Sequence, residues 1–119
     1  MDSLAQARRI AALAQEKLAE DVLILDMRSE CTFTDYFVIA TGRNPRQTAA
    51  IWDEVHEKLK QGEQHIPRSV DGVRDGTWIL ADYLDVVLHV FTPDAREYYK
   101  LEELWGDLPA VELDTAASA

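Results

Sequence analysis

Apolar and polar positions in the first part of the chain switch between helical spacing and short continuous runs. Ser3 is followed three residues later by glutamine, a capping-box pattern that marks a helix start. The apolar residues that then recur at helical spacing are Leu4, Ala7, Ala11, Ala14 and Leu18. They predict a helix over residues 3–19. Two aliphatic runs, residues 22–27 and 36–41, predict buried strands.

The start of a second helix is the clearest local signal. Gly42 ends the second expected strand, Asn44 can cap the helix, and Pro45 suits its first position. We expect this helix to stop near Gly62, because glycine is a common helix terminator. Its expected inner stripe is Thr48, Trp52, Val55 and Leu59.

The rest of the chain predicts three strands and one helix. Residues 68–70 indicate a short edge strand, and the runs at 78–83 and 85–91 are so close that they predict a tight antiparallel hairpin. Thr92 and Pro93 then open a last helix. The residues expected along one side of it are Tyr98, Leu101 and Trp105.

The element order is helix, two strands, helix, three strands, helix, which predicts an α/β or α+β fold with helices packed on a mixed sheet. A length of 119 residues allows one domain, which we expect over residues 1–108. Residues 109–119 are acidic or small and are expected to form a flexible tail.

Composition narrows the cellular setting. No apolar run approaches the roughly 18–20 residues that cross a bilayer, so neither export nor membrane insertion is indicated. Cys31 is the sole cysteine, which rules out an internal disulfide. We expect a cytoplasmic protein.

Charge is distributed unevenly along the sequence. Residues 1–70 carry 11 acidic and 9 basic side chains, whereas residues 71–119 carry 11 acidic and 3 basic ones. A negative field repels phosphate and favours basic surfaces, so we expect a basic protein partner and little or no direct contact with nucleic acid. Acidic surfaces also simply keep proteins soluble, and charge alone does not separate these two interpretations.

Metal and cofactor chemistry find little support in the sequence. His56, His65 and His89 fall on an expected helix, a loop and a strand, without the spacing of a zinc site. The turn at residues 42–46 could contact an anion, but it lacks the glycine patterns of nucleotide-binding loops. A capped helix start is the favoured interpretation, and we expect no cofactor and no metal.

Enzymatic activity has one candidate pair of residues. Asp82 and Asp85 bracket the hairpin turn and could support metal-dependent nucleotidyl transfer, although turn formation is their ordinary role. No glycine-flanked serine marks a hydrolase elbow. We therefore expect a protein that acts by binding and is not an enzyme, and keep the metal-dependent nucleotidyltransferase as the alternative.

Trp78 is the candidate for a binding anchor. It opens a strand directly after a turn, where a tryptophan is either part of the core or an exposed interface residue. Trp52 and Trp105 already have places on expected inner helical stripes. Together with the acidic residues beyond position 70, this favours Trp78 as the centre of a docking surface.

Four ordered motifs resemble the Iojap or ribosomal silencing factor (RsfS) family. They lie at residues 34–42, 46–47, 78–91 and 96–105, and the resemblance covers about residues 3–107. The resemblance implies a nucleotidyltransferase-like fold without the catalytic signature of the transferases.

The same resemblance implies a function and a site. It implies binding to ribosomal protein L-fourteen on the large subunit, which would block joining of the small subunit and lower translation when nutrients are scarce. It also implies that the free protein is a homodimer. The residues that it implicates are Trp78, Leu80, Asp82, Tyr83 and Asp85, with Arg96 and Tyr99 beside them.

Leu84 departs from the family pattern. It stands where the hairpin turn of the family usually has glycine. Because a leucine rarely adopts a positive φ, we expect the turn to avoid that conformation.

Overall fold

The computed structural model describes residues 2–105 and 107–113. Its helices are α1 (Ser3–Glu16), α2 (Pro45–Gly62), α3 (Pro93–Tyr99) and α4 (Leu101–Leu104). Its strands are β1 (Glu20–Asp26), β2 (Tyr36–Thr41), β3 (Ser69–Asp71), β4 (Trp78–Asp82), β5 (Val86–Phe91) and β6 (Ala110–Val111).

The six strands form one mixed sheet in the order β3-β4-β5-β2-β1-β6. Only the central pair, β2 and β5, is parallel among the strand pairs of the described residues, and the other neighbours are antiparallel. The predicted hairpin is confirmed, with Trp78 opposite Phe91 and Asp82 opposite Val87. The short edge strand is confirmed as β3. The structure thus confirms a mixed α+β fold with the expected element order.

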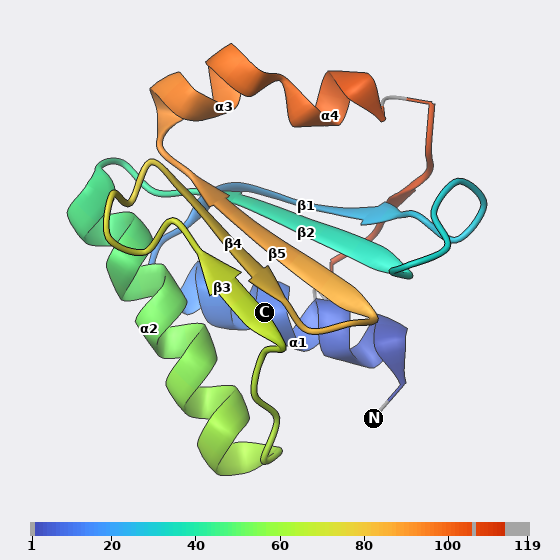
Figure 1. Ribbon diagram of the computed structural model, residues 1–119, viewed down its shortest axis with the longest axis horizontal. Coiled ribbons are helices and arrows are strands. Elements are labelled where there is room, and N and C mark those ends of the chain that lie inside the picture. Colours follow the sequence, from blue (N-terminus) through green and yellow to red (C-terminus); the bar gives the residue numbers. More distant parts are fainter. Residues whose placement is uncertain (1, 106, 114–119) are drawn as a thin grey trace.

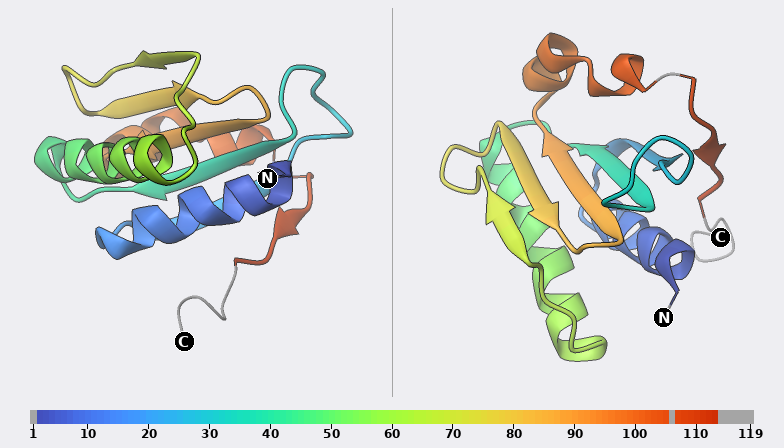
Figure 2. Two further views of the ribbon diagram at one scale, coloured as in Figure 1. Left: turned by 90° about the horizontal axis from the view of Figure 1, so that it is seen from below. Right: turned by 45° about the vertical axis from the view of Figure 1, so that its right-hand side comes forward.

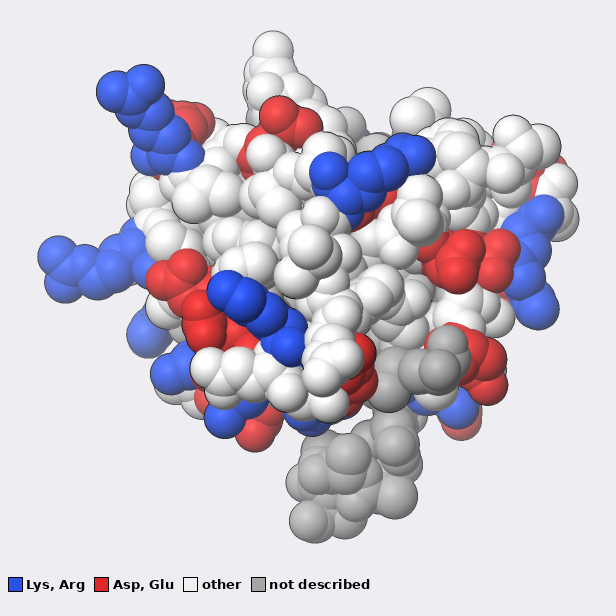
Figure 3. Space-filling model, turned by 60° about the horizontal axis from the view of Figure 1, so that its bottom comes forward, with Lys and Arg blue, Asp and Glu red and all other residues white. Residues whose placement is uncertain are grey.

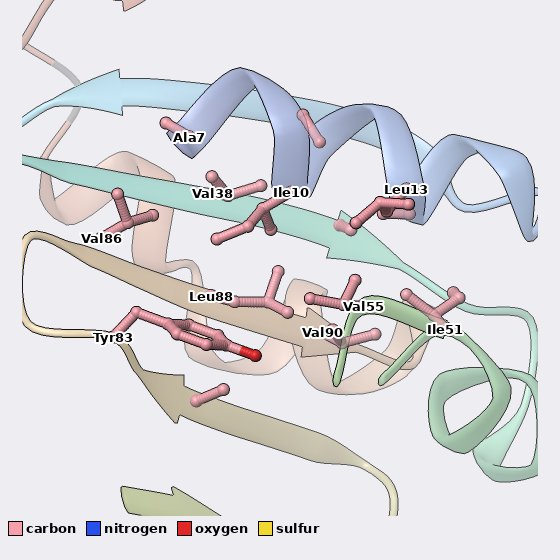
Figure 4. Close-up of a cluster of buried hydrophobic side chains, with 14 of the residues drawn as sticks. Ala7, Ile10, Leu13, Val38, Ile51, Val55, Tyr83, Val86, Leu88 and Val90 are labelled. Carbon is pink, nitrogen blue, oxygen red and sulfur yellow. The ribbon is translucent and has the colours of Figure 1, made fainter. Parts of the chain in front are cut away.

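Helices cover both faces of the sheet (Figures 1 and 2). Helices α1 and α2 pack on one face and enclose a first core cluster, shown in Figure 4. This cluster includes Ile10, Val38, Ile51, Val55, Leu88 and Val90. A second core cluster lies on the opposite face beneath α3 and α4, and includes Leu25, Met27, Phe37, Ile39, Val87 and Phe91.

Helices α3 and α4 cover only part of the sheet face on which the second core cluster lies. Leu101 and Trp105 pack on the second core cluster, and the Trp105 ring lies 6.4 Å from the ring of Phe37 on β2. In Figure 1, α3 and α4 run along the top of the view, nearest to β1 and β2, whereas β4 and β3 lie farther below them. One face of β4 is therefore left for other contacts.

Helix α1 differs from its prediction at both ends. The side chain of Asp2, not that of Ser3, caps the helix by accepting the N–H of Ala5 at 2.7 Å. The helix ends at Glu16, three residues early, because Leu18 has a φ of 63° and a left-handed residue stops an α-helix.

Helix α2 matches its prediction closely. The Oδ1 atom of Asn44 accepts the N–H of Gln47 at 2.9 Å, and Pro45 is the first helical residue. The helix ends at Gly62. All four residues of the expected inner stripe are buried: Thr48, Trp52, Val55 and Leu59.

The last predicted helix is two helices. Lys100 adopts a left-handed conformation, with φ 50° and ψ 45°, and separates α3 from α4. The prediction that Tyr98 lines the inner side is wrong, since its side chain is 80% exposed. Leu101 and Trp105 do pack inward.

The expected tail contributes to the sheet. Ala110 and Val111 form β6, which pairs with Leu25 and Ile24 of β1. Residues 110 and 111 therefore belong to the fold, contrary to the predicted boundary at residue 108. The last part of the expected tail, residues 114–119, lies outside the described residues. Within the described ranges, no helix is long and apolar enough to cross a membrane.

Candidate functional site

The uncovered face of β4 brings together several of the residues that the sequence singled out. Trp78, Leu80 and Asp82 alternate along the strand and therefore point to the same face. Asp71 of β3 pairs with Leu80 and shares that face. Tyr99, half exposed at the end of α3, lies against Trp78 with 4.7 Å between ring centroids. We call these five residues the β4 surface.

Trp78 is half-buried and firmly packed. Its ring stacks on Phe91 at 5.0 Å, and its indole N–H donates to Nδ1 of His89 at 3.1 Å. The structure thus places Trp78 between a core residue and an exposed one, and its role as a binding anchor stays a prediction. One side of the ring belongs to the second core cluster, and the remainder adjoins Leu80 on the surface.

The turn that leads into β4 is tightly built. Gly72 has a φ of 85°, and a Cβ atom there would lie 1.9 Å from the carbonyl oxygen of Trp78. Only glycine fits so close to another backbone. This contact fixes the start of β4, and with it the position of Trp78.

The two carboxylates of the β4 surface differ in their pairing. Asp82 is engaged twice: Oδ2 accepts from Nη2 of Arg68 at 2.6 Å, and Oδ1 accepts the N–H of Leu84 at 2.8 Å. Asp71 is exposed and forms no ion pair within the part of the chain that the structure describes. Asp71 is therefore the carboxylate that a cationic partner group could pair with directly.

Tyr83 lies in the core and not on the β4 surface. It is 2% exposed, and its ring is stacked on His65 at 5.0 Å and lies 6.3 Å from Trp52. Figure 4 shows the ring pointing into the first core cluster near Leu88. Burial raises the pKa of the Tyr83 hydroxyl well above its ordinary value. The structure therefore does not bring Tyr83 onto the β4 surface, and its contact with a partner stays a prediction.

The hairpin turn also differs from its expectation. Leu84 has a φ of 75°, so the turn uses the left-handed conformation that the sequence led us to exclude. The N–H of Tyr83 donates to the carbonyl of Val86 at 2.9 Å, and this bond closes the turn around Leu84. The turn keeps a geometry suited to glycine, and a half-exposed leucine bears the strain.

Asp85 lies on the other side of the hairpin from Asp82. It is exposed and lines a hollow on the side of the sheet that α1 and α2 cover, with Gln6, Glu63 and His65. Two carboxylates directed to different sides of a sheet cannot share a metal ion. The described residues contain no group of three or more His, Cys, Asp or Glu side chains placed to hold one. The geometry therefore gives no support to the nucleotidyltransferase alternative.

Arg96 is an internal anchor of α3. Its side chain is 14% exposed and pairs with Glu102 at 2.8 Å. Its Nη1 donates to the hydroxyl of Thr41 and to the carbonyl of Asp21, each at 2.7 Å. Arg96 thus connects α3 and α4 to the start of β1 and the end of β2. The structure does not bring Arg96 onto the β4 surface.

His89 is the residue beneath this surface that sequence reasoning missed. It is 3% exposed, lies opposite Leu80 in the hairpin register and accepts the Trp78 indole N–H. Strand alternation puts His89 and Phe91 on one face of β5, and the hairpin puts that face beside Trp78. The alternation of β5 and its pairing with β4 therefore contain the signal that places His89 beside Trp78.

Charges of both signs share the side of the molecule on which α1 and α2 lie. Figure 3 turns that side towards the reader, and basic and acidic side chains are interleaved there with uncharged areas between them. The net charge of −10 is therefore not a uniform field over this face.

Comparison with known proteins identifies the family. The family model described as "RsfS: Ribosomal silencing factor during starvation" matches residues 1–119. The chain is 40% identical over 104 residues to ribosomal silencing factor RsfS of Bacillus subtilis, with 87% of each chain covered. It is 36% identical over 105 residues to the RsfS of Chromobacterium violaceum, with 85% of each chain covered.

Solved structures agree with the sequence comparison. A crystal structure of a Chromobacterium violaceum protein matches with a TM-score of 0.85 at 30% identity, covering 89% of this chain and 88% of the other. One from Bacillus halodurans matches with a TM-score of 0.76 at 37% identity, covering 92% and 97%. As the resemblance of its four motifs predicted, the chain belongs to the RsfS family of ribosomal silencing factors, which are regulators and not enzymes.

Proposed function

We propose that this protein binds the large ribosomal subunit through ribosomal protein L-fourteen and thereby blocks joining of the small subunit. Translation would fall when nutrients are scarce. The observation that supports this most directly is the β4 surface, which combines a half-buried tryptophan with carboxylates on an uncovered sheet face. Family membership supports the ribosome as the target.

The chemistry of the β4 surface suits a basic protein. Its centre, Trp78 and Leu80, is apolar, and its rim carries Asp71 and Asp82. Interfaces commonly have such an apolar centre within a polar rim, and aromatic residues are frequent at their energetic centres. Carboxylates attract the lysines and arginines of a ribosomal protein and repel RNA phosphates. We infer that protein contacts, not RNA contacts, provide most of the affinity.

Steric exclusion needs no enzymatic step. A factor that occupies the face where the small subunit docks removes free large subunits from the joining equilibrium by mass action. It shifts that equilibrium only as far as its affinity for free subunits exceeds its affinity for joined ribosomes. The factor therefore acts through occupancy, and its effect scales with its concentration relative to Kd.

We also propose that the free protein is a cytoplasmic homodimer. The resemblance to the family supports this, and the exposed apolar side chains of Tyr98 and Leu104 offer area for self-association. Analytical ultracentrifugation over a range of protein concentrations measures the mass directly. A monomer mass at every concentration would contradict the dimer and leave ribosome binding untouched.

Co-sedimentation with isolated large subunits tests the proposed function. Trp78→Ala and Tyr99→Ala should each weaken binding by about tenfold or more, because central aromatic contacts dominate such interfaces. Phe33→Ala is the matched control: Phe33 is 65% exposed, in the connection between β1 and β2. It should bind within about twofold of the unaltered protein. Wild-type affinity in both test variants would reject the site.

Two further measurements address the partner and the mechanism. A photo-crosslinker placed at Tyr99 should mark ribosomal protein L-fourteen, and exclusive labelling of another component would reject that partner.

Light scattering after mixing the two subunits should show slower joining with the unaltered protein and normal joining with Trp78→Ala. Normal joining with the unaltered protein bound would reject steric exclusion.

A further inference from the structure

A buried histidine lies directly beneath the β4 surface. His89 is 3% exposed, and the centroid of its ring lies 4.6 Å from that of Phe37 and 6.2 Å from that of Phe91. Phe37, Phe91 and their neighbours in the second core cluster are apolar. A polar ring in such surroundings is costly unless it forms hydrogen bonds. Packing alone would be served better by leucine or phenylalanine.

The hydrogen bond that His89 does form determines its tautomer. An indole N–H can only donate, so the Trp78 N–H at 3.1 Å requires an unprotonated Nδ1 on His89. The proton of the neutral ring is then on Nε2, which is buried and has no partner among the described residues. Burial lowers the pKa of His89 to about 3, so the ring remains a neutral acceptor at cellular pH. The buried imidazole is thus engaged with Trp78 and with no other described polar group.

We propose that His89 is a positioning residue for Trp78, which holds the indole in one orientation and presents its apolar edge to the partner. This inference rests on the proposed function and deepens it. The indole N–H is satisfied inside the molecule, so Trp78 offers the partner packing and not a hydrogen bond. The class of contact that follows is an aliphatic or aromatic side chain placed against Trp78 and Leu80.

Loss of the acceptor would release this orientation. The stacked contact with Phe91 and the tilted contact with Tyr99 tolerate a flipped indole, because both faces of the ring are apolar. A flipped ring turns the N–H away from His89, either to solvent or into an unsatisfied position. Binding then requires the ring to be ordered again, at a cost in affinity.

Two variants separate acceptor chemistry from packing. His89→Asn keeps an acceptor, since its side-chain oxygen lies near the place of Nδ1, whereas His89→Leu fills the space without one. Ile39→Val is the control for stability, because Ile39 is fully buried, neighbours His89 in the sheet and makes no bond to Trp78. Each variant is compared with the unaltered protein in two measurements.

The first measurement is hydrogen exchange at the Trp78 indole N–H, followed by NMR on the free protein and assigned with Trp78→Phe. Exchange should be slow in the unaltered protein and His89→Asn, and at least about tenfold faster in His89→Leu. The indole signals of Trp52 and Trp105 serve as internal references. Unchanged exchange in His89→Leu would overturn the proposal, whatever the ribosome experiments show.

The second measurement is affinity for isolated large subunits. His89→Leu should bind about tenfold more weakly, while His89→Asn and Ile39→Val stay within about threefold of the unaltered protein. Equal weakening in His89→Leu and Ile39→Val would make the effect one of stability and overturn the positioning role. If the unaltered protein failed to bind large subunits, the proposed function would be rejected. The claim that the orientation of Trp78 serves this binding would be rejected with it. The exchange result would still decide whether His89 orients Trp78.

Discussion

Backbone strain at Leu84 and burial of His89 are the two single-residue features that set the β4–β5 hairpin apart. Leu84 has a φ of 75° at a turn whose geometry suits glycine. His89 places a titratable ring in the core, beside the second core cluster. Both features cost folding free energy, and each can be measured with one substitution.

Leu84→Gly should stabilise the protein by about 0.5–1 kcal/mol. Glycine relieves a left-handed strain of about 1–2 kcal/mol, and part of that gain is offset by the greater freedom of glycine in the unfolded chain. Urea unfolding measures the change. The control is Leu104→Gly at the exposed last residue of α4, which has no positive φ to relieve; this variant should be no more stable than the unaltered protein and should lose at most about 1 kcal/mol. Equal destabilisation by both substitutions would show that the turn at Leu84 is not strained.

His89 should make stability fall in mild acid. The unfolded imidazole titrates near pH 6.5 and the folded one near pH 3, so between these values only the unfolded chain binds the proton. Acidification therefore favours unfolding, by about 1.4 kcal/mol for each pH unit in that window. Urea unfolding between pH 7 and pH 4 should show this slope relative to His89→Asn. Parallel curves for the two proteins would mean that His89 titrates normally in the fold.

At the scale of elements, the position of α3 and α4 on the sheet depends on a few polar contacts. The left-handed Lys100 divides α3 from α4, and Arg96 spans this break to reach Glu102. The same guanidinium bonds to Thr41 at the end of β2. The position of α3 and α4 therefore depends on Arg96. Because these helices lie beside the uncovered face of β4, Arg96 also helps to keep that face uncovered.

Arg96→Ala should destabilise the protein by about 2 kcal/mol. The side chain is largely buried, and its removal leaves the Thr41 hydroxyl and the Asp21 carbonyl without their donor. Arg28→Ala is the matched control, because its pair with Asp26 is exposed and should contribute less than about 1 kcal/mol. Thermal unfolding of both variants gives the comparison. A smaller loss for Arg96→Ala than for Arg28→Ala would contradict the anchoring role.

The sequence predicted those elements whose signals are local. Helix α2 has its cap, proline and inner stripe within one segment, and the β4–β5 hairpin has two apolar runs beside a short turn. The break at Lys100 has neither glycine nor proline to mark it. Strand β6 has two residues and forms only by pairing with distant β1. Such features follow from tertiary contacts, which local patterns do not contain.

The candidate site was predicted in part, for a related reason. The family resemblance implicated Trp78, Leu80 and Asp82, and the structure places all three on one face because they lie two residues apart on one strand. Tyr83 and Asp85 are in or beside the turn, where alternation ends and neighbouring side chains diverge into the core and towards the helices. The share of Trp78 that is buried depends on Tyr99 and Phe91, which only the assembled fold brings to it.

At the scale of the whole molecule, the proposed function joins an acidic protein to a basic ribosomal protein through one uncovered sheet face. The chain carries 22 acidic and 12 basic side chains, so overall attraction to a basic partner needs no particular surface. Specific docking, in contrast, does need a particular surface. A charge reversal within the β4 surface and a matched reversal outside it separate these two effects.

The most direct measurement is the affinity of Asp71→Lys and Asp53→Lys for isolated large ribosomal subunits. Both positions are exposed, and each substitution changes the net charge equally, but Asp71 lies beside Leu80 and Asp53 lies on α2. We predict that Asp71→Lys weakens binding by at least about tenfold, since it opposes a basic partner at the contact, while Asp53→Lys changes it by less than about threefold. Equal effects of the two substitutions would contradict docking through the β4 surface.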